Sequence, residues 1–228
     1  MTATVIYYTS NQEHPKFENR IIKNLLKATN LPIISVSQRP IDLGGNICIG
    51  DVGVSNFNMF RQIQIGCQNT KADFVISAEA DCMYPPDYFT FRPKELDRCY
   101  RNSNLYVMPD HRNYWFHKEE GATHSQVIGR KYYLEILDKL FEGAPKWSIE
   151  EKNFPKERNK KEDIFDKIYH WQTENPVFQV KTHRSMRYYT HSEREPIYDL
   201  PYWGSGRDVR ANLMKEVKEI YRREDAHN

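Results

Sequence analysis

Apolar residues in the first part of the chain follow two alternating patterns, one typical of strands and one typical of helices. They dominate positions 4–8 and 33–37, as in short buried strands. Between these two stretches they recur at helical spacing. The helical set is Phe17, Ile21, Ile22, Leu25 and Leu26. A strand, a helix and a strand in this order predict a βαβ unit and therefore a parallel sheet.

A polar stretch over residues 38–55 predicts a loop, because it contains one proline and four glycines. A second helix is expected after it, with Ser55 or Asn56 as the N-cap. The apolar face of this helix consists of Phe57, Phe60, Ile63 and Cys67. Gly44 and Gly45 do not form a phosphate-binding glycine loop, because the order strand, glycine, helix does not surround them.

Residues 74–89 carry the most informative chemistry of the chain. They open with an apolar run typical of a buried strand and reach Pro85 and Pro86, which neither a helix nor a central strand accommodates. Between them, Glu79 and Asp81 are spaced i and i+2, which places both on one side of an extended chain. In open α/β sheets, ligands bind at this end of the strands. Two carboxylates held close together repel each other unless a cation, such as a hard divalent metal ion, lies between them.

The pattern beyond the two prolines predicts shorter elements. Strands are expected at residues 105–108, 114–116 and 177–182, and helices at residues 94–102 and 133–141. A further helix is expected to begin at Glu162 and Asp163, with Ile164, Phe165 and Ile168 on its apolar side. The last helix has Val209, Leu213, Val217 and Ile220 along one face.

Composition narrows the class of protein without naming a function. The chain has 228 residues, of which 28% are charged, and a net charge of +2, which does not by itself indicate a nucleic-acid partner. The four cysteines include no Cys-X-X-Cys pair, which argues against a zinc site. No stretch reads as a signal peptide or a membrane span, so we expect a soluble protein of a reducing compartment, the cytoplasm, or the host cytoplasm for a phage protein.

The motif Glu79-Ala80-Asp81, followed by Pro85, resembles the Asp-X-Asp signature of GT-A-fold glycosyltransferases, especially those similar to family 2. The resemblance implies an α/β fold with a mixed, mainly parallel sheet and helices on both faces. It implies one domain over residues 1–228. Its nucleotide-sugar-binding half covers about residues 1–110, its acceptor half about residues 111–191, and a helical tail residues 192–228.

The same resemblance implies roles for individual residues on the donor side. The first acid and its neighbour, Glu79 and Ala80, would contact the sugar nucleotide, and Asp81 would hold Mn²⁺ or Mg²⁺ against the diphosphate. The nucleotide base would lie beside Thr9, Ser10 and Asn11, and Arg61 would lie near the diphosphate. Three alternatives stay open: a solvated acidic loop at residues 79–81, a helix N-cap at residues 9–11, and a solvated helix arginine.

The order of an acid pair, a helix, a strand and a histidine, found in residues 162–183, also resembles these enzymes. It implies that Asp163 is the catalytic base, with Glu162 as its stand-in. It also implies that His183, or His191 in its place, is a metal ligand. The alternative is that the acid pair complements the dipole of the helix that it begins.

Together these resemblances imply a metal-dependent, inverting hexosyltransferase that uses a UDP-sugar and an acceptor hydroxyl. Basic residues crowd positions 152–161, and in this respect the chain looks similar to phage-encoded transferases that glycosylate hydroxylated DNA bases. A glycan, a protein or a small molecule remains open as the acceptor. Two other functions also remain open: a non-catalytic nucleotide- or nucleic-acid-binding α/β module, and a nucleotidyltransferase, against which stands the lack of a glycine-rich loop after the first strand.

Overall fold

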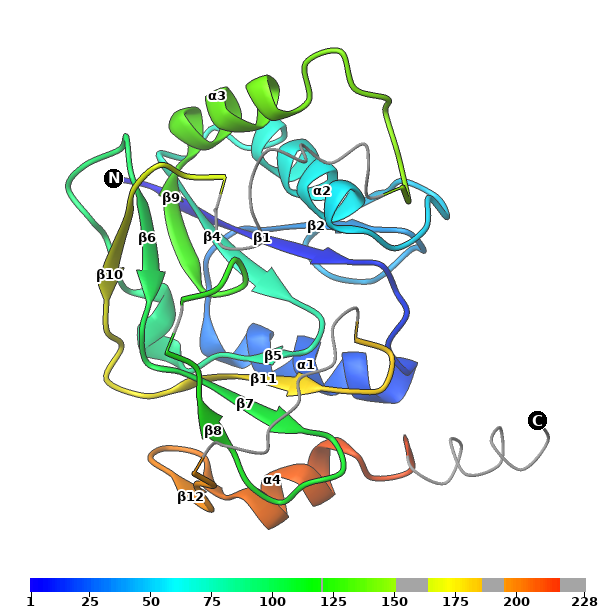
Figure 1. Cartoon of the computed structure of the whole chain (residues 1–228), viewed down its shortest axis with the longest axis vertical. Helices are drawn as coiled ribbons and strands as arrows, with labels where there is room; N and C mark the ends of the chain where they lie inside the picture. Colours follow the sequence, from blue (N-terminus) through cyan, green and yellow to red (C-terminus); the bar gives the residue numbers. More distant parts are fainter. Residues whose placement is uncertain (120, 151–163, 186–194, 218–228) are drawn as a thin grey trace.

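A seven-stranded sheet forms the centre of the computed structural model, which describes residues 1–119, 121–150, 164–185 and 195–217 (Figure 1). The strand order is β10-β6-β9-β4-β1-β2-β3. The strands are β1 (Ala3–Thr9), β2 (Ile33–Ser37), β3 (Gly45–Cys48), β4 (Phe74–Glu79), β6 (Cys99–Asn102), β9 (Gln126–Gly129) and β10 (Ile168–Trp171). β1 pairs in parallel with both β2 and β4, whereas β9 runs antiparallel between β4 and β6. The predicted βαβ unit and the mixed, mainly parallel sheet are therefore confirmed.

Helices cover both faces of this sheet because successive side chains of each strand point to opposite faces. On one face, Val5 and Tyr7 of β1 share a buried cluster with Ile22 and Leu25. The latter two belong to α1 (Pro15–Ala28). On the other face, Ile6 and Tyr8 pack with the apolar sides of α2 (Asn56–Gln68) and α3 (Arg130–Leu140). No helix in the described parts of the chain has the length and apolar composition to cross a bilayer.

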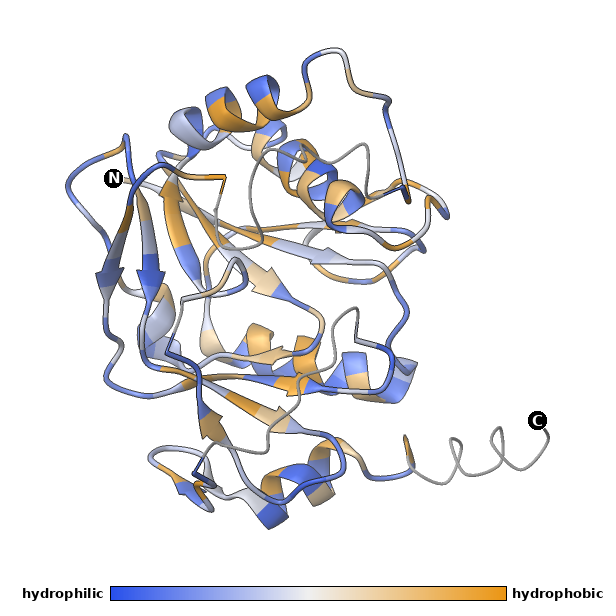
Figure 2. Ribbon diagram, viewed as in Figure 1, coloured by the Kyte–Doolittle hydropathy of each residue, from blue (hydrophilic) through white to orange (hydrophobic). Residues whose placement is uncertain are grey.

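A second, four-stranded sheet in the order β5-β11-β7-β8 overlaps α1 and extends below it in Figure 1, and it carries the C-terminal elements. Its strands are β5 (Cys82–Met83), β7 (Leu105–Pro109), β8 (Phe116–His117) and β11 (Val177–Lys181). The elements nearby are η1 (Pro86–Phe89), β12 (Asp199–Leu200), β13 (Gly204–Ser205) and α4 (Gly206–Leu213). Figure 2 shows apolar residues concentrated on α1 and on the adjoining strands, where Phe17 and Ile21 join a third buried cluster with Phe178 and Val180.

Two predicted helices are wrong, for the same physical reason. Residues 99–102 of the stretch 94–102 form β6, and Ile168 lies in β10 instead of on a helix face. β6 pairs with β9 on one side and with β10 on the other, so its backbone groups are bonded by partners distant in sequence. Such non-local pairing overrides a local propensity for helix. Of the predicted strand at residues 114–116, Phe116 belongs to β8 and Trp115 forms an isolated bridge with Ile197.

Candidate functional site

A pocket opens where β1 and β4 end, at the carboxyl edge of the parallel strands. Five residues expected on the donor side line it: Thr9, Ser10, Glu79, Ala80 and Asp81. The structure therefore brings the turn after the first strand and the acid motif together. The enclosed volume is about 140 Å³. Pockets that bury most of a drug-sized ligand hold about 300–1,000 Å³, so a pocket of this size would enclose only part of such a ligand.

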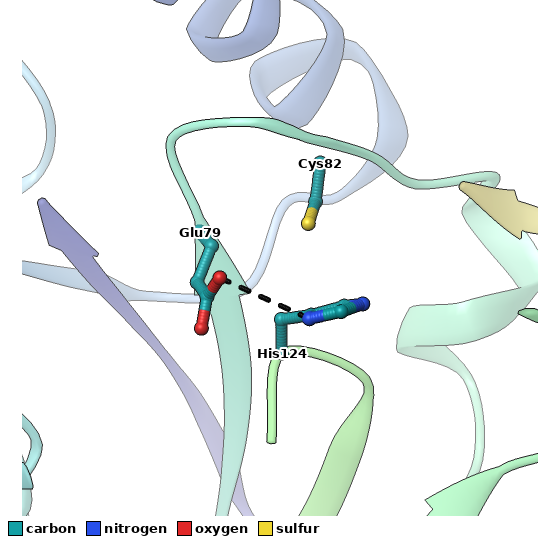
Figure 3. Close-up of side chains that lie close together, drawn as sticks. All are labelled: Glu79, Cys82 and His124. Atoms are coloured by element: carbon teal, nitrogen blue, oxygen red, sulfur yellow. Dashed lines mark ion pairs between the residues drawn. The ribbon is translucent and has the colours of Figure 1, made fainter. Parts of the chain in front are cut away.

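Glu79 lies at the end of β4 between two buried side chains. The Tyr8 hydroxyl donates a hydrogen bond of 2.7 Å to Oε1 of Glu79. Oε2 lies 3.8 Å from Nδ1 of His124 (Figure 3). Burial, and then the charge of Asp81, raise the pKa of Glu79 to about 7. Because burial also holds the pKa of His124 well below its usual value, the imidazole is neutral at pH 7 and the contact with Glu79 is not a charged pair.

Asp81 is the point at which the second sheet meets the first. Its Oδ2 accepts a hydrogen bond of 2.9 Å from Nε2 of Gln179, and the Cys82 thiol donates to its Oδ1 at 3.2 Å. The amide of Val180 donates to the main-chain oxygen of Asp81 at 2.8 Å. β5 follows the acid motif directly and pairs antiparallel with β11, which fixes Asp81 against Gln179.

A third carboxylate in the pocket, Glu13, is one that the sequence did not indicate. Its two oxygens accept from the Thr182 hydroxyl at 2.8 and 3.0 Å. Burial, and then the charge of Asp81, raise the pKa of Glu13 to about 8, although the bond from Thr182 acts in the opposite direction. Asp81 thus disfavours the charged form of both Glu13 and Glu79. A hard divalent cation would relieve this repulsion, and carboxylate oxygens are the donors that Mn²⁺ and Mg²⁺ prefer.

The pocket also has a cationic side, formed by Lys181 at the end of β11 and by Arg184 just beyond it. The Arg184 guanidinium donates to the main-chain oxygen of Gln12 at 3.0 Å, which places it beside the loop that carries Glu13. The sequence contained one signal for these residues: both lie at the end of the predicted strand 177–182 or just after it, at the same edge as the acids. Acids and bases that line one pocket suit a metal ion and the phosphate groups that it accompanies.

Amide side chains hold the wall of the pocket opposite β11. Nε2 of Gln62 donates to the main-chain oxygens of Thr9 at 2.8 Å and Val36 at 2.9 Å, where β1 and β2 end. Nε2 of Gln38 donates to the oxygen of Gly53 at 2.8 Å. Nδ2 of Asn58 donates to the same oxygen at 3.1 Å. The bonds from Gln38 and Asn58 fix the loop before α2 in place.

Asn11 lies in the turn after β1 but is not among the residues that line the pocket. Its φ of 53° is left-handed, a conformation that asparagine tolerates better than most residues. Its amide donates to the Thr9 hydroxyl at 2.9 Å, and its Oδ1 accepts from the amide of Arg39 at 2.8 Å. The alternative that residues 9–11 cap the first helix is wrong, because His14 caps α1 by accepting from the amide of Lys16.

Arg61 is also absent from the pocket lining. Its guanidinium carbon lies 3.8 Å from the centre of the Phe141 ring, and the group donates to the main-chain oxygen of Pro145 at 2.9 Å. Arg61 therefore braces α2 against the end of α3, on a different side of the helix from Asn58 and Gln62. The cationic side chains that line the pocket are those of Lys181 and Arg184.

The structure does not bring His183 into the pocket lining. Its side chain is 51% exposed, and Nδ1 lies 3.9 Å from Oδ2 of Asp110. The other residues expected in the acceptor half, Glu162, Asp163 and His191, lie outside the described residues. Their assignments as base and metal ligand stay predictions.

Comparison with known proteins identifies the fold. No protein-family model matches the chain, and no curated protein matches it. Among solved structures, the inositol-1-phosphate CTP transferase from T. maritima aligns over 94% of this chain and 97% of its own, with a TM-score of 0.50 and 10% identity. S. aureus TarS 1-349 in complex with UDP-GlcNAc aligns over 83% of this chain and 62% of its own, with a TM-score of 0.44 and 12% identity.

The bifunctional IspDF from Campylobacter jejuni aligns over 77% of this chain, with a TM-score of 0.41 and 12% identity, and the chain spans only 50% of its length. The match to the CTP transferase extends over nearly all of both chains. The predicted fold class, a mixed and mainly parallel sheet with helices on both faces, is therefore confirmed, and the chain shares this fold with the CTP transferase. Because identities of this order leave few residues in common, the activity has to be argued from the pocket itself.

Proposed function

We propose that this chain is a glycosyltransferase that binds a nucleotide sugar, in the first place a UDP-sugar, in the pocket at the ends of β1 and β4. The observation that carries the proposal is the convergence of Glu79 and Asp81 with Lys181 and Arg184 in that pocket. The carboxylates suit a divalent ion, and the two cations suit a diphosphate through charge-assisted hydrogen bonds. Thr9 and Ser10, on the β1 side, would lie beside the nucleotide base.

Asp81 and Glu13 are the residues that would hold Mn²⁺ or Mg²⁺, with His191 as a further candidate. When bound, such an ion neutralises negative charge on a leaving diphosphate. Gln179 orients the Asp81 carboxylate through its 2.9 Å hydrogen bond, and Lys181 and Arg184 would pair with the phosphate oxygens. Glu79, held by Tyr8, would contact the sugar nucleotide, as would the backbone of Ala80.

For the acceptor side, we propose inversion with Asp163 as the base and Glu162 as its alternative. Asp163→Asn should lower turnover by about 10²- to 10⁴-fold, the usual contribution of general-base catalysis. The dissociation constant of the donor should stay near that of the parent, because the base contacts the acceptor hydroxyl. Glu162→Gln is the matched control. If it is the inactive variant and Asp163→Asn is fully active, the two roles are exchanged.

The experiment that tests the proposed function measures binding and product together. Calorimetry with UDP, UDP-glucose and UDP-N-acetylglucosamine, with and without Mn²⁺, should show metal-dependent binding. Incubation with each UDP-sugar should then release UDP and free sugar by slow hydrolysis. A non-catalytic binding module would bind without releasing UDP. A nucleotidyltransferase would instead release pyrophosphate from a nucleoside triphosphate and a sugar phosphate, and either result would overturn the proposal.

The acceptor that we propose to test first is DNA containing hydroxylated bases, before glycans, proteins and small molecules. The reason is the group of basic residues Lys156, Arg158, Lys160 and Lys161, which lies outside the described residues. Replacing all four by alanine should make the slope of log K for duplex DNA against log salt less steep, by about 0.9 for each phosphate that these side chains neutralise in the parent. An unchanged slope would exclude this segment from DNA binding.

A further inference from the structure

Three side chains with different donor atoms meet behind the pocket: Glu79 at the end of β4, Cys82 in β5 and His124 shortly before β9 (Figure 3). One potential ligand atom from each, a carboxylate oxygen, a sulfur and an imidazole nitrogen, all lie within 4.8 Å of one another. Oε2 of Glu79 and Nδ1 of His124 are 3.8 Å apart. The group comes from three segments, and two of its members are buried.

The histidine in this group lacks the hydrogen bonds that a buried imidazole normally makes. His124 is 4% exposed, and its Nε2 has no hydrogen-bond partner among the described residues. The 3.8 Å contact of Nδ1 with Glu79 is longer than a hydrogen bond. Buried polar atoms in proteins are nearly always satisfied. Nδ1, which faces Glu79 in Figure 3, is the nitrogen available to an ion bound in this group, whereas Nε2 points away from it.

Sulfur, imidazole nitrogen and carboxylate oxygen together are the donors that zinc takes in proteins, whereas Mg²⁺ and Mn²⁺ prefer oxygen alone. We propose that Glu79, Cys82 and His124 bind a zinc-class divalent ion, at a site separate from the oxygen ligands Asp81 and Glu13. Three protein ligands leave a fourth position of a tetrahedral site free. Glu79 also lines the pocket, so the site adjoins the pocket.

The site requires only small movements. Bonds of about 2.0–2.3 Å place tetrahedral ligand atoms roughly 3.3–3.8 Å apart, which the separation of Glu79 and His124 already meets. The thiol of Cys82, which lies within 4.8 Å of the other two ligand atoms, approaches by at most about 1 Å, loses its proton to solvent and binds as the thiolate. It then no longer donates to Oδ1 of Asp81, the bond that it makes at 3.2 Å without metal. Metal binding here thereby changes the hydrogen bonding of Asp81. The sequence did not indicate this site, because it contains no Cys-X-X-Cys pair and His124 is distant in sequence from Glu79 and Cys82.

Cobalt(II) tests the site directly, without nucleotide and without activity. The untagged full-length protein, freed of metal by chelator, is titrated with Co²⁺ alone and then with Zn²⁺ alone. We expect one equivalent of Co²⁺ to produce a thiolate-to-cobalt absorption in the near ultraviolet and Zn²⁺ to displace it. The absorption should be lost in Cys82→Ser and His124→Gln and unchanged in Cys48→Ser, whose cysteine is exposed and far along the chain from the group. Its absence from the parent, or its persistence in Cys82→Ser, overturns the proposal.

A second measurement uses only the parent protein, so its result does not depend on whether the variants fold. X-ray absorption of the zinc-loaded protein should show one sulfur at about 2.3 Å and lighter atoms at about 2.0–2.2 Å. A shell of nitrogen and oxygen alone would overturn the proposal. The result is independent of the proposed transferase function, since a chain that binds zinc here but no UDP-sugar refutes only the latter.

Discussion

The two sheets of this protein supply groups of opposite charge to the same pocket. In the seven-stranded sheet, strand β4 ends at Glu79, and the turn that follows it places Asp81 in the pocket. In the four-stranded sheet, strand β11 ends at Lys181, and Arg184 follows just after it. The first sheet contains a βαβ unit whose strands β1 and β2 are close in sequence, whereas the second joins β5 to β11, which follows much later along the chain. The comparison teaches that the acids of a site can be positioned by elements close in sequence while its bases are positioned by pairing between strands distant in sequence.

Removing the negative charge of Asp81, which lies where the two sheets meet, should have the largest effect on ligand binding. Asp81→Asn keeps the shape of the side chain but removes the charge that a hard cation requires. We expect Mn²⁺-dependent binding of UDP to become undetectable while the fold persists, as measured by calorimetry and circular dichroism. Asp97→Asn, whose side chain is 80% exposed, is the matched control and should bind like the parent. Unchanged Mn²⁺ dependence in Asp81→Asn would remove Asp81 from the metal site.

Removing the cations of the second sheet should have the next largest effect. Arg184→Ala and Lys181→Ala should each weaken UDP-sugar binding by about 1.5–3 kcal/mol, the usual contribution of a hydrogen bond to a charged group, or roughly 10- to 150-fold. Arg61→Ala should weaken it less, because the Arg61 guanidinium lies over Phe141 outside the pocket lining. Dissociation constants measured by calorimetry decide between them. A larger loss of affinity in Arg61→Ala would show that Arg61 of α2, and not Lys181 or Arg184, contacts the diphosphate.

The smallest expected effect concerns pH and the loop of Glu13. The pKa of Glu13 is raised from 4.5 to about 8, so between these values the folded state keeps a proton that the unfolded chain has lost. The free energy of unfolding should therefore fall as pH rises from about 4.5 to 8 and level off above it. Because Glu13 is partly exposed, we expect a change of about 1–3 kcal/mol.

Denaturant titrations between pH 5 and 9 measure this dependence. Glu13→Gln should flatten the profile, and Glu174→Gln, at an exposed position, should leave it unchanged. Glu79, whose pKa is raised to about 7, contributes in the same direction, so a shallower fall should remain in Glu13→Gln. A profile identical to that of the parent in Glu13→Gln would show that the carboxyl is not buried in solution.

The first sheet was largely predictable because its signals are local. Side-chain periodicity places β1, α1, β2, α2 and β4, and the spacing of Glu79 and Asp81 places both acids in one pocket. β6 and β10 were not predictable, since their partners decide their structure. Helical periodicity likewise identifies which side of α2 is apolar but not which polar residue faces the pocket. That choice depends on how α2 packs against β1 and α3, and it places Gln62 at the pocket and Arg61 outside it.

The amide side chains around the loop before α2 have a consequence for the speed and cost of ligand capture. Gln38 also accepts from the amide of Val52 at 3.2 Å, and Asn58 donates to the oxygen of Val52 at 2.7 Å, so both residues hold the same short segment from two sides. The loss of backbone entropy that fixing this segment requires therefore occurs during folding, before any ligand binds. A ligand that binds on this side would need no ordering step, so its association would be limited by diffusion and docking instead of by the rate at which a wall of the pocket assembles.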